Sequence, residues 1–393
     1  MRNSKTALRG NDIRKVNEKL VLRLIQQEKV FSQSEAVEIT GLKPPTILRI
    51  FTNLEEDGLI EVSDARKVSS DRKGRKPVYY RLNPEALYVV GVEFWSRSAS
   101  VVISNFVREP VYSDSLNVDP DKGSQAVVRK VSSLIERSLK AAGIVPGQLA
   151  GIGIGAPGRV DIETGKVLFY SRIDGLNDFN ITEFFEDKFN VPVIVHNNCS
   201  VIALNEYHSK KMENDGNIMA VLIRGGVGGS YINQGRVLTS SNITTMEIGH
   251  MSIDPDGDIC SCGSKGCLET LLSEEAILTA TRKAAGIDNI TDLESALYAS
   301  GEPADKLAPV LDEKAEVLAY AIRNLNQLLS PGKFLIISRS LELSRRLADG
   351  ASDILNCNGI AGEYRLEAVL YDPMQAGMGA CDIVFQEYFT GGL

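Results

Sequence analysis

One histidine and three cysteines lie close together in the second half of this chain. His250 precedes the segment Cys260-Ser-Cys-Gly-Ser-Lys-Gly-Cys267, so three thiols fall within eight residues. An imidazole and three thiolates are typical of a closed tetrahedral zinc site, with Zn–S bonds of about 2.3 Å. The glycines allow the backbone to turn tightly between the thiols. The spacing therefore predicts a structural Zn²⁺ held by His250, Cys260, Cys262 and Cys267; reduced, unliganded cysteines or a redox pair are the alternatives.

Length and composition indicate a folded globular protein of two or three domains. The 393 residues are 43% hydrophobic and 24% charged, which is ordinary for a soluble protein. No stretch reaches the ~20 apolar residues that cross a bilayer, and the first residues lack the apolar core of a secretory signal. Six cysteines in such a chain favour metal binding over a disulfide framework. We expect a cytoplasmic protein with no membrane contact.

Charge is distributed unevenly along the chain. Residues 1–82 carry 17 Lys and Arg against 11 Asp and Glu, whereas the rest carries 26 against 40. A basic head on an acidic body is typical of a protein that binds a localised anionic partner such as DNA. The alternative is a solvated basic surface, and charge alone does not decide between the two.

Two short helical patterns separated by a tight turn occupy residues 32–58. Ser32-Gln-Ser-Glu35 is a capping box that opens the first helix, and Gly41 supplies the turn. The second helix begins at Lys43-Pro44-Pro45-Thr46, where prolines are harmless because first-turn amides lack intrahelical partners. Its apolar stripe leaves four polar residues facing outward: Lys43, Thr46, Arg49 and Asn53. This is a helix-turn-helix pattern.

A basic hairpin follows the second helix. Residues 59–63 and 78–82 alternate like strands, and residues 66–77 between them are rich in Arg and Lys. Such a hairpin is the wing of a winged helix, and arginine at its tip suits a narrow A/T-rich minor groove. We expect the helix to read major-groove edges through Lys43, Pro44, Pro45, Thr46 and Arg49, and the wing to contact the minor groove or phosphates through Arg75 and Lys76. The alternative is a small helical subdomain with a solvated loop, acting as a protein-docking module.

The remaining residues alternate between short apolar runs and longer helical stretches. Residues 88–95, 99–106, 149–154, 193–196 and 218–223 are predicted strands, and residues 125–142 and 200–210 are predicted helices. Alternation of this kind builds an α/β fold with mixed sheets. About 300 residues favour two lobes with a cleft between them.

These motifs together resemble the ROK family (repressors, open reading frames and sugar kinases), and specifically its winged-helix repressors of the xylose-repressor type. The resemblance covers nearly the whole chain and rests on the head, residues 153–158, His196-Asn197-Asn198, Glu247–His250, the cysteine segment and Ala376–Ala380. It implies a two-lobed, actin-like and ribonuclease-H-like sugar-kinase fold that forms dimers or tetramers. We therefore expect a DNA-binding domain over residues 1–82 and an effector-binding and oligomerisation domain over residues 83–393, with a zinc loop at about 247–269.

The chain departs from the kinase members of this family at several positions. Their Asp-x-Gly-Gly-Thr, which lets the backbone approach ATP phosphates, is Glu93-Phe-Trp-Ser-Arg97 here, and their base Asp is Asn198. Bulky side chains remove the flexible turn of a phosphate cradle, and an amide cannot accept the sugar proton. A late Gly-Gly is Ser338-Arg339, and the second phosphate loop survives only in part as residues 224–229. We expect no phosphoryl transfer and no catalytic residue.

The resemblance also implies a carbohydrate pocket. The family contacts fall on Asn197, Asn198, Glu247, His250 and Glu269, and a further family Asn falls on Arg172. Amides and carboxylates suit vicinal hydroxyl groups. Arg172, with Asn198 in place of an acid, makes the pocket more positive than in the family, which suggests a sugar acid, a sugar phosphate or an otherwise atypical carbohydrate as effector. An ordinary ion pair between Arg172 and Asp174 or Asp178 is the alternative that we favour from sequence alone.

The sequence thus predicts a sugar-responsive repressor that binds an A/T-rich, palindromic operator as a homodimer or tetramer and changes its DNA affinity when a small carbohydrate closes the cleft. Two alternatives stay open. The first is an ATP-dependent sugar kinase with an appended DNA-binding head. The second is a regulator with a vestigial pocket that responds to a partner protein, against which the retained Glu247, His250 and Glu269 count.

Overall fold

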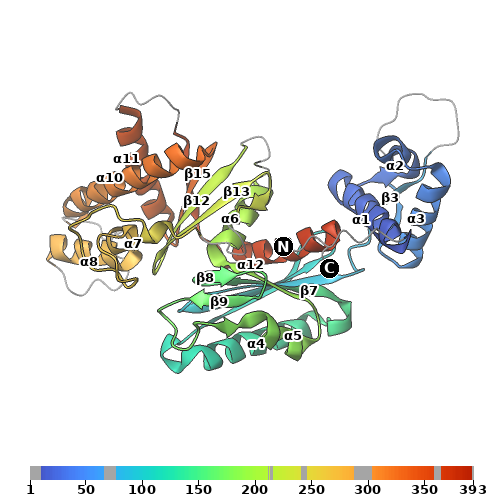
Figure 1. Ribbon diagram of the computed structural model, residues 1–393, viewed down its shortest axis with the longest axis horizontal. Coiled ribbons are helices and arrows are strands. Elements are labelled where there is room, and N and C mark those ends of the chain that lie inside the picture. Colours follow the sequence, from blue (N-terminus) through green and yellow to red (C-terminus); the bar gives the residue numbers. More distant parts are fainter. Residues whose placement is uncertain are drawn as a thin grey trace.

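The computed structural model describes residues 10–65, 77–210, 212, 216–239, 246–286, 303–357 and 364–391. Figure 1 shows an N-terminal head beside a body of two lobes, each built on a β-sheet. Helices cover the sheets, so the α/β fold class predicted from the sequence is confirmed. Within the described ranges, none of the helices combines the length and the apolar character that crossing a bilayer requires.

Over residues 10–65 and 77–82 the head contains three helices and a small sheet with strand order β1-β3-β2. Its elements are α1 (Gly10–Glu28), β1 (Phe31–Ser32), α2 (Gln33–Thr40), α3 (Pro44–Glu56), β2 (Ile60–Ser63) and β3 (Tyr79–Leu82). The predicted capping box is present, because the Ser32 side chain accepts the Glu35 amide and the Glu35 carboxylate accepts the Ser32 amide. Gly41, at φ 68°, ends α2 in the left-handed conformation that glycine adopts without strain.

Helix α3 packs its apolar stripe into the head as the sequence predicts. Ile47, Ile50, Phe51 and Leu54 are all buried. Asn53 differs from the expectation, because it is half-buried and its amide donates to Glu18 of α1 at 3.1 Å. It therefore ties α3 to α1 and does not face outward. The short strand β1, which pairs with β3, was not predicted.

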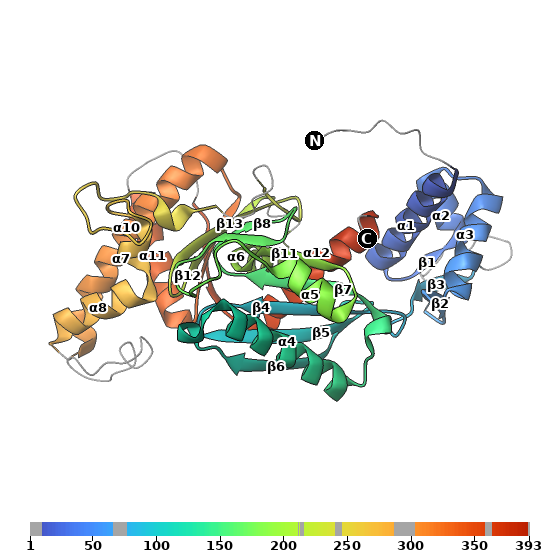
Figure 2. The same ribbon diagram turned by 60° about the horizontal axis from the view of Figure 1, so that its bottom comes forward.

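The first lobe contains a five-stranded sheet of order β11-β7-β4-β5-β6. Its strands are β4 (Tyr88–Phe94), β5 (Ser98–Asn105), β6 (Pro110–Asn117), β7 (Leu149–Ala156) and β11 (Val193–Asn197), with α4 (Gly123–Ala142) and α5 (Ile181–Phe189) as its helices. A small sheet of β8 (Arg159–Asp161), β9 (Lys166–Phe169) and β10 (Phe179–Asn180) lies beside it. Figure 2 shows α4 and α5 on one side of the large sheet.

The second lobe repeats the same topology with order β14-β13-β12-β15-β16. Its strands are β12 (Ile218–Ile223), β13 (Val227–Asn233), β14 (Arg236–Val237), β15 (Lys333–Ser338) and β16 (Leu366–Leu370), and its helices are α7 (Leu268–Leu272), α8 (Glu274–Ala285), α10 (Pro303–Leu329) and α11 (Leu341–Cys357). In both sheets the first strand is central, with an antiparallel hairpin on one side and parallel strands on the other. The lobes are therefore two versions of one fold unit.

Two helices fill the junction between the lobes: α6 (Asn198–Ser209) and α12 (Pro373–Thr390). Helix α12 packs against α6 and against β4, β5 and β7 of the first lobe, while α6 also contacts β12 and β13 of the second. Small residues permit this close packing. A Cβ added to Gly153 of β7 would lie 1.8 Å from the Ala380 carbonyl oxygen, and one added to Gly379 would lie 1.8 Å from that of Val201.

The end of α12 also contacts the head. The ammonium of Lys19 in α1 lies 3.3 Å from the centroid of the Tyr388 ring, a cation–π contact. Partial burial, and then the nearby Lys15, lower the pKa of Lys19 to about 8. Phe106 of the first lobe stacks on Phe389, next to Tyr388. The head therefore rests on the last helix of the body.

We predict that Gly153→Ala lowers the free energy of unfolding by about 1–3 kcal/mol, because the new methyl group overlaps the backbone of α12. Gly147→Ala is the matched control, since its Cβ would meet nothing within 4 Å. Denaturant melts of both variants provide the measurement. Equal stability of the two variants would show that β7 and α12 are not packed this closely.

Candidate functional site

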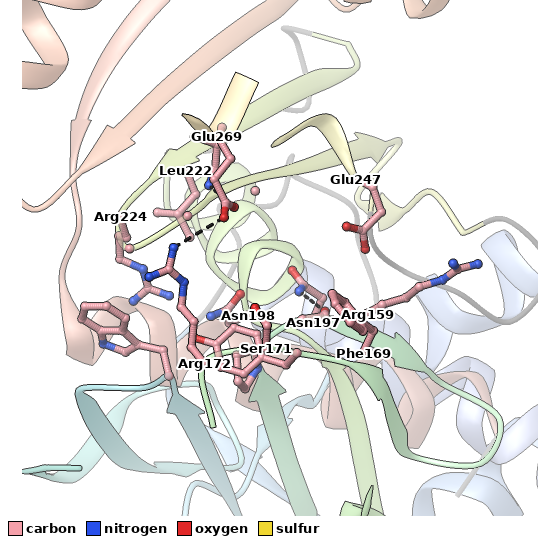
Figure 3. Close-up of a pocket in the computed structure, with 18 of the residues that line it drawn as sticks. Arg159, Phe169, Ser171, Arg172, Asn197, Asn198, Leu222, Arg224, Glu247 and Glu269 are labelled. Carbon is pink, nitrogen blue, oxygen red and sulfur yellow. Dashed lines mark hydrogen bonds and ion pairs between the residues drawn. The ribbon is translucent and has the colours of Figure 1, made fainter. Parts of the chain in front are cut away.

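A pocket opens between the two lobes, and side chains from both line it (Figure 3). The first lobe contributes the ends of β4 and β7 and the segment after β9, and the second contributes the β12–β13 turn and the cysteine segment. All six residues that the sequence predicted to contact a carbohydrate lie on this pocket: Arg172, Asn197, Asn198, Glu247, His250 and Glu269. The topology therefore brings together residues that are up to 97 positions apart in the chain.

The two asparagines lie where β11 ends and α6 begins. Asn197 is the N-cap of α6: its side-chain oxygen accepts the Cys199 amide at 2.8 Å, and its amide donates to the Gly158 carbonyl at 2.6 Å. Asn198 is 9% exposed and lines the pocket. Asn197 therefore holds the start of the helix in place, and Asn198 presents an amide to a ligand.

Four soft donor atoms converge beside the pocket. The ligand atoms of His250, Cys260, Cys262 and Cys267 all lie within 4.8 Å of one another. His250 Nδ1 is 3.5 Å from the Cys260 sulfur, and the Cys262 and Cys267 sulfurs are 3.7 Å apart. Gly263 and Gly266 have positive φ, and a Cβ at Gly266 would overlap the Asp254 carbonyl. The turn thus needs glycine to gather the thiols, and the cluster could hold a metal ion.

The histidine connects this cluster to the pocket. Its Nδ1 faces the thiols, whereas its Nε2 lies 3.6 Å from the Glu247 carboxylate. Partial burial raises the pKa of Glu247. An ion on Nδ1 would fix the orientation of the imidazole and hence of its partner carboxylate.

Arg172 points into the pocket and does not pair with Asp174 or Asp178, so the ion pair favoured from sequence alone is wrong. Its Nη2 lies 3.4 Å from Glu269 Oε1, and Glu269 Oε2 accepts the Val227 amide at 3.3 Å. Arg172 belongs to the first lobe and Glu269 opens α7 of the second. The contact therefore crosses the cleft.

A buried ion pair closes one end of the pocket. Glu93, in the apolar strand β4, has no exposed surface, and its Oε1 accepts from Arg224 Nη2 at 2.8 Å. The Tyr371 hydroxyl donates to Glu93 Oε2 at 2.7 Å. Burial alone would lower the pKa of Arg224, but the Glu93 carboxylate more than offsets this and the pKa is raised. All three side chains are therefore held by one another across the lobe junction.

Trp95 lies over this ion pair. The Arg224 guanidinium is 4.9 Å from its ring centroid and that of Arg339 is 5.5 Å away. Arg339 is itself held by two hydrogen bonds to Glu274, of 2.9 and 2.6 Å. The segment expected to have lost the flexible turn of a phosphate cradle is thus occupied by a packed aromatic ring between two cations.

This cluster was not predicted from the sequence. The fully buried Glu93 within an apolar strand was the available signal, because a buried carboxylate needs a cation or a set of donors. Nothing in the sequence shows that the partner is Arg224, 131 positions away. Arg159, which is exposed at the rim of the pocket near Glu247, was also missed.

The residues proposed to contact DNA lie at the start of α3. Lys43, Pro44, Pro45 and Arg49 are exposed and Thr46 is half-buried, so they share an open face. Leu48, which is 55% exposed, was not predicted. Arg75 and Lys76 lie outside the described residues.

Comparison with known proteins gives relatives of two kinds. A xylose repressor of Caldicellulosiruptor bescii is 24% identical over 370 residues, which are 90% of each chain. A solved ROK family transcriptional regulator, described as a homologue of the Escherichia coli MLC protein, has a TM-score of 0.79 and 23% identity over 96% of this chain and 97% of its own. A ROK family glucokinase from Streptomyces griseus, solved with glucose and AMPPNP, has a TM-score of 0.62 and 20% identity over 76% of this chain and 99% of its own.

The solved regulator and the solved kinase share this fold, and the regulator's match extends over the head as well as the body. Residues 90–349 match the model of the ROK family. Because that match covers more than half of the sequence, the chain belongs to the ROK family.

Proposed function

We propose that this protein is a sugar-responsive, DNA-binding transcriptional regulator, a repressor of carbohydrate-use genes whose kinase-like body binds its effector without phosphorylating it. One combination of features carries the proposal: an exposed helix-turn-helix is joined to a polar interlobe pocket beside which Trp95, packed on the Glu93–Arg224 pair, occupies the turn after β4. The repressor relative aligns over 90% of both chains, which supports it. We place the DNA-binding domain at residues 1–82, the effector-binding and oligomerisation domain at residues 83–393, and the protein in the cytoplasm.

The head has what major-groove recognition requires. The exposed start of α3 offers the Arg49 guanidinium and the Lys43 ammonium to base edges or phosphates, and Leu48 offers an apolar surface to thymine methyl groups. The wing, with Arg75 and Lys76, would contact the adjacent minor groove or phosphates. A homodimer, or a tetramer built from two, would place paired heads on a palindromic, A/T-rich operator.

The pocket has the polar lining that hydroxyl groups need. Asn197, Asn198, Glu247, His250 and Glu269 offer amides, carboxylates and one imidazole to a small carbohydrate. Binding would draw the lobes together, because Asn198 belongs to the first lobe's end of α6 whereas Glu247 and Glu269 belong to the second. The ligand changes DNA affinity only if it binds the two conformations with different affinity.

The alternative function is an ATP-dependent sugar kinase with an added head. Glucokinases among the similar proteins are the reason to consider it. Two groups count against it. Asn198 cannot act as a base, and Trp95 with Arg224 fills the turn where a kinase needs open backbone amides.

The cysteine cluster fits a structural Zn²⁺. Two thiolates on a tetrahedral zinc with bonds of about 2.3 Å are about 3.8 Å apart, and the Cys262 and Cys267 sulfurs are separated by 3.7 Å. His250 and the three cysteines complete four ligands, which leaves no open position for a substrate. The metal would hold the loop at about 247–269 in place, and through it Glu247.

We predict that Arg49→Ala weakens binding to an operator selected from a random DNA pool by at least about tenfold, because it removes a base or phosphate contact. Lys140→Ala, on the exposed face of α4 in the body, removes the same charge outside the head and serves as the control. Fluorescence anisotropy at fixed ionic strength measures both. An unchanged affinity of the Arg49 variant would contradict the proposed DNA-binding face.

We predict that the protein forms no ADP from Mg·ATP with any of a panel of hexoses and pentoses in a coupled assay. Asn198→Asp restores the family's acid but should also stay inactive, because Trp95, packed on Arg224, still occupies the turn after β4. ADP formation by the unmodified protein would support the kinase alternative. ADP formation by the variant alone would show that only the base is missing and that the turn after β4 admits the phosphates of ATP.

We predict one zinc per chain, and loss of that zinc in Cys262→Ser with a lower melting temperature, since the loop loses its cross-link. Cys357→Ser is the control, because this exposed cysteine lies outside the cluster. Elemental analysis and thermal melts give the two readouts. Full zinc content in the Cys262 variant would refute the ligand set.

A further inference from the structure

The two sides of the pocket differ in their polar groups. Figure 3 shows the guanidinium groups of Arg172 and Arg224 on the side of Glu269, and the Glu247 carboxylate on the opposite side. A Cβ at Gly225 would lie 3.8 Å from Nη1 of Arg172 and 3.3 Å from the Trp95 ring. Arg172, Arg224 and the turn at Gly225-Gly226 therefore meet at one end of the cleft.

Several donors at this end have no acceptor. Arg224 is 3% exposed, and its Nη1 is buried without a hydrogen-bond partner among the described residues. The amides of Gly225 and Gly226 likewise donate to no other described residue. Two guanidinium groups and two backbone N–H groups thus lie at one end of the pocket lining, which is the chemistry of an anion site.

The carboxylates nearby do not saturate these donors. Glu93, which is not among the residues that line the pocket, accepts from Nη2 of Arg224. Glu269 is the carboxylate that faces the donors, but its contact with Arg172 is 3.4 Å long, whereas charge-assisted hydrogen bonds are about 2.7–2.9 Å. Glu269 also accepts the Val227 amide. Arg172, whose side chain is 34% exposed, is thus free to exchange Glu269 for another anion.

We propose that the effector is a carbohydrate carrying one anionic group, a phosphate ester or a carboxylate, which binds Arg172, Arg224 Nη1 and the Gly225-Gly226 amides. The hydroxylated part of the ligand lies toward Asn198 and Glu247. This inference rests on the proposed function and specifies the class of its effector. A nucleoside triphosphate would need both phosphate loops of a kinase, and Trp95 fills one of them.

Binding of the anion would also act on the lobes. Arg172 lies in the first lobe and Glu269 in the second, so the free protein has an ion pair across the cleft. An anionic ligand takes Glu269's place on the guanidinium and leaves that carboxylate to accept ligand hydroxyl groups. The direct contact between the lobes is then replaced by one through the ligand.

The test is calorimetric titration of the full chain with matched ligands: glucose, glucose 6-phosphate, glucuronate, xylose, xylose 5-phosphate, inorganic phosphate and Mg·ATP. We expect an anionic sugar to bind at least about tenfold more tightly than its neutral counterpart, the scale of one charged hydrogen bond. Arg172→Gln should abolish this preference. Arg129→Gln, an exposed arginine on α4, should leave it intact.

The outcomes separate this inference from the proposed function. If a neutral sugar binds as tightly as its anionic counterpart and shifts operator affinity, the anion site is refuted and the sugar-responsive regulator stands. An unchanged preference in Arg172→Gln refutes the anion site as well. If inorganic phosphate or Mg·ATP binds as tightly as the sugar phosphate, the ligand is no carbohydrate and the inference fails. If no carbohydrate binds, both fail.

Discussion

The buried ion pair between Glu93 and Arg224 is the interaction on which the body depends. Glu93 lies inside an apolar strand of the first lobe, where an unpaired carboxylate would be prohibitively unstable. Its partner comes from the end of β12 in the second lobe, and Tyr371 satisfies the other carboxylate oxygen. Breaking a buried pair by removing one partner typically costs about 3–5 kcal/mol. The central strands of both sheets are thereby joined at one point.

We propose that this point is also where the chain departs from a kinase. The turn after β4 carries Trp95, which packs against the same Arg224, so the cluster that joins the lobes occupies the place of a flexible phosphate turn. The polar cleft lies next to this cluster, with Arg172, Arg224 and Glu269 on one side and Glu247 and Arg159 on the other. We propose that a kinase-like body of this kind binds a small polar ligand without phosphorylating it.

The junction helices connect this cleft to the head. Helix α6 begins at the pocket with Asn198 and packs along α12, whose last turn carries Tyr388 beneath Lys19 of α1. Gly379 and Gly153 let α12 approach α6 and β7 closely, so a displacement of one element also displaces the element packed against it. This packed path is a physical route for coupling between the pocket and the head. The free energy of that coupling depends on how differently the ligand binds the two conformations of the protein.

Local sequence patterns predict much of the fold. The Ser32–Glu35 capping box, the left-handed Gly41 and the apolar runs of β4, β7 and β12 follow from short-range rules, and most predicted elements match within a few residues. The grouping of the four donor residues could equally be predicted, because they lie within eighteen positions of the sequence. Contacts between residues far apart in the sequence could not be predicted. Arg172 pairs with Glu269 and not with the nearby Asp174, and Asn53 donates to Glu18, because tertiary packing places these partners within reach.

Operator affinity measured against a carbohydrate panel tests the central claim most directly. Labelled operator, selected by the protein itself, is titrated with the full chain at constant ionic strength with each sugar, sugar acid and sugar phosphate, with Mg·ATP present, and the ligands are then recovered for mass spectrometry. The account predicts that at least one carbohydrate shifts the operator affinity and is recovered unmodified. Phosphorylation of the added sugar, with no carbohydrate altering DNA binding, would contradict it.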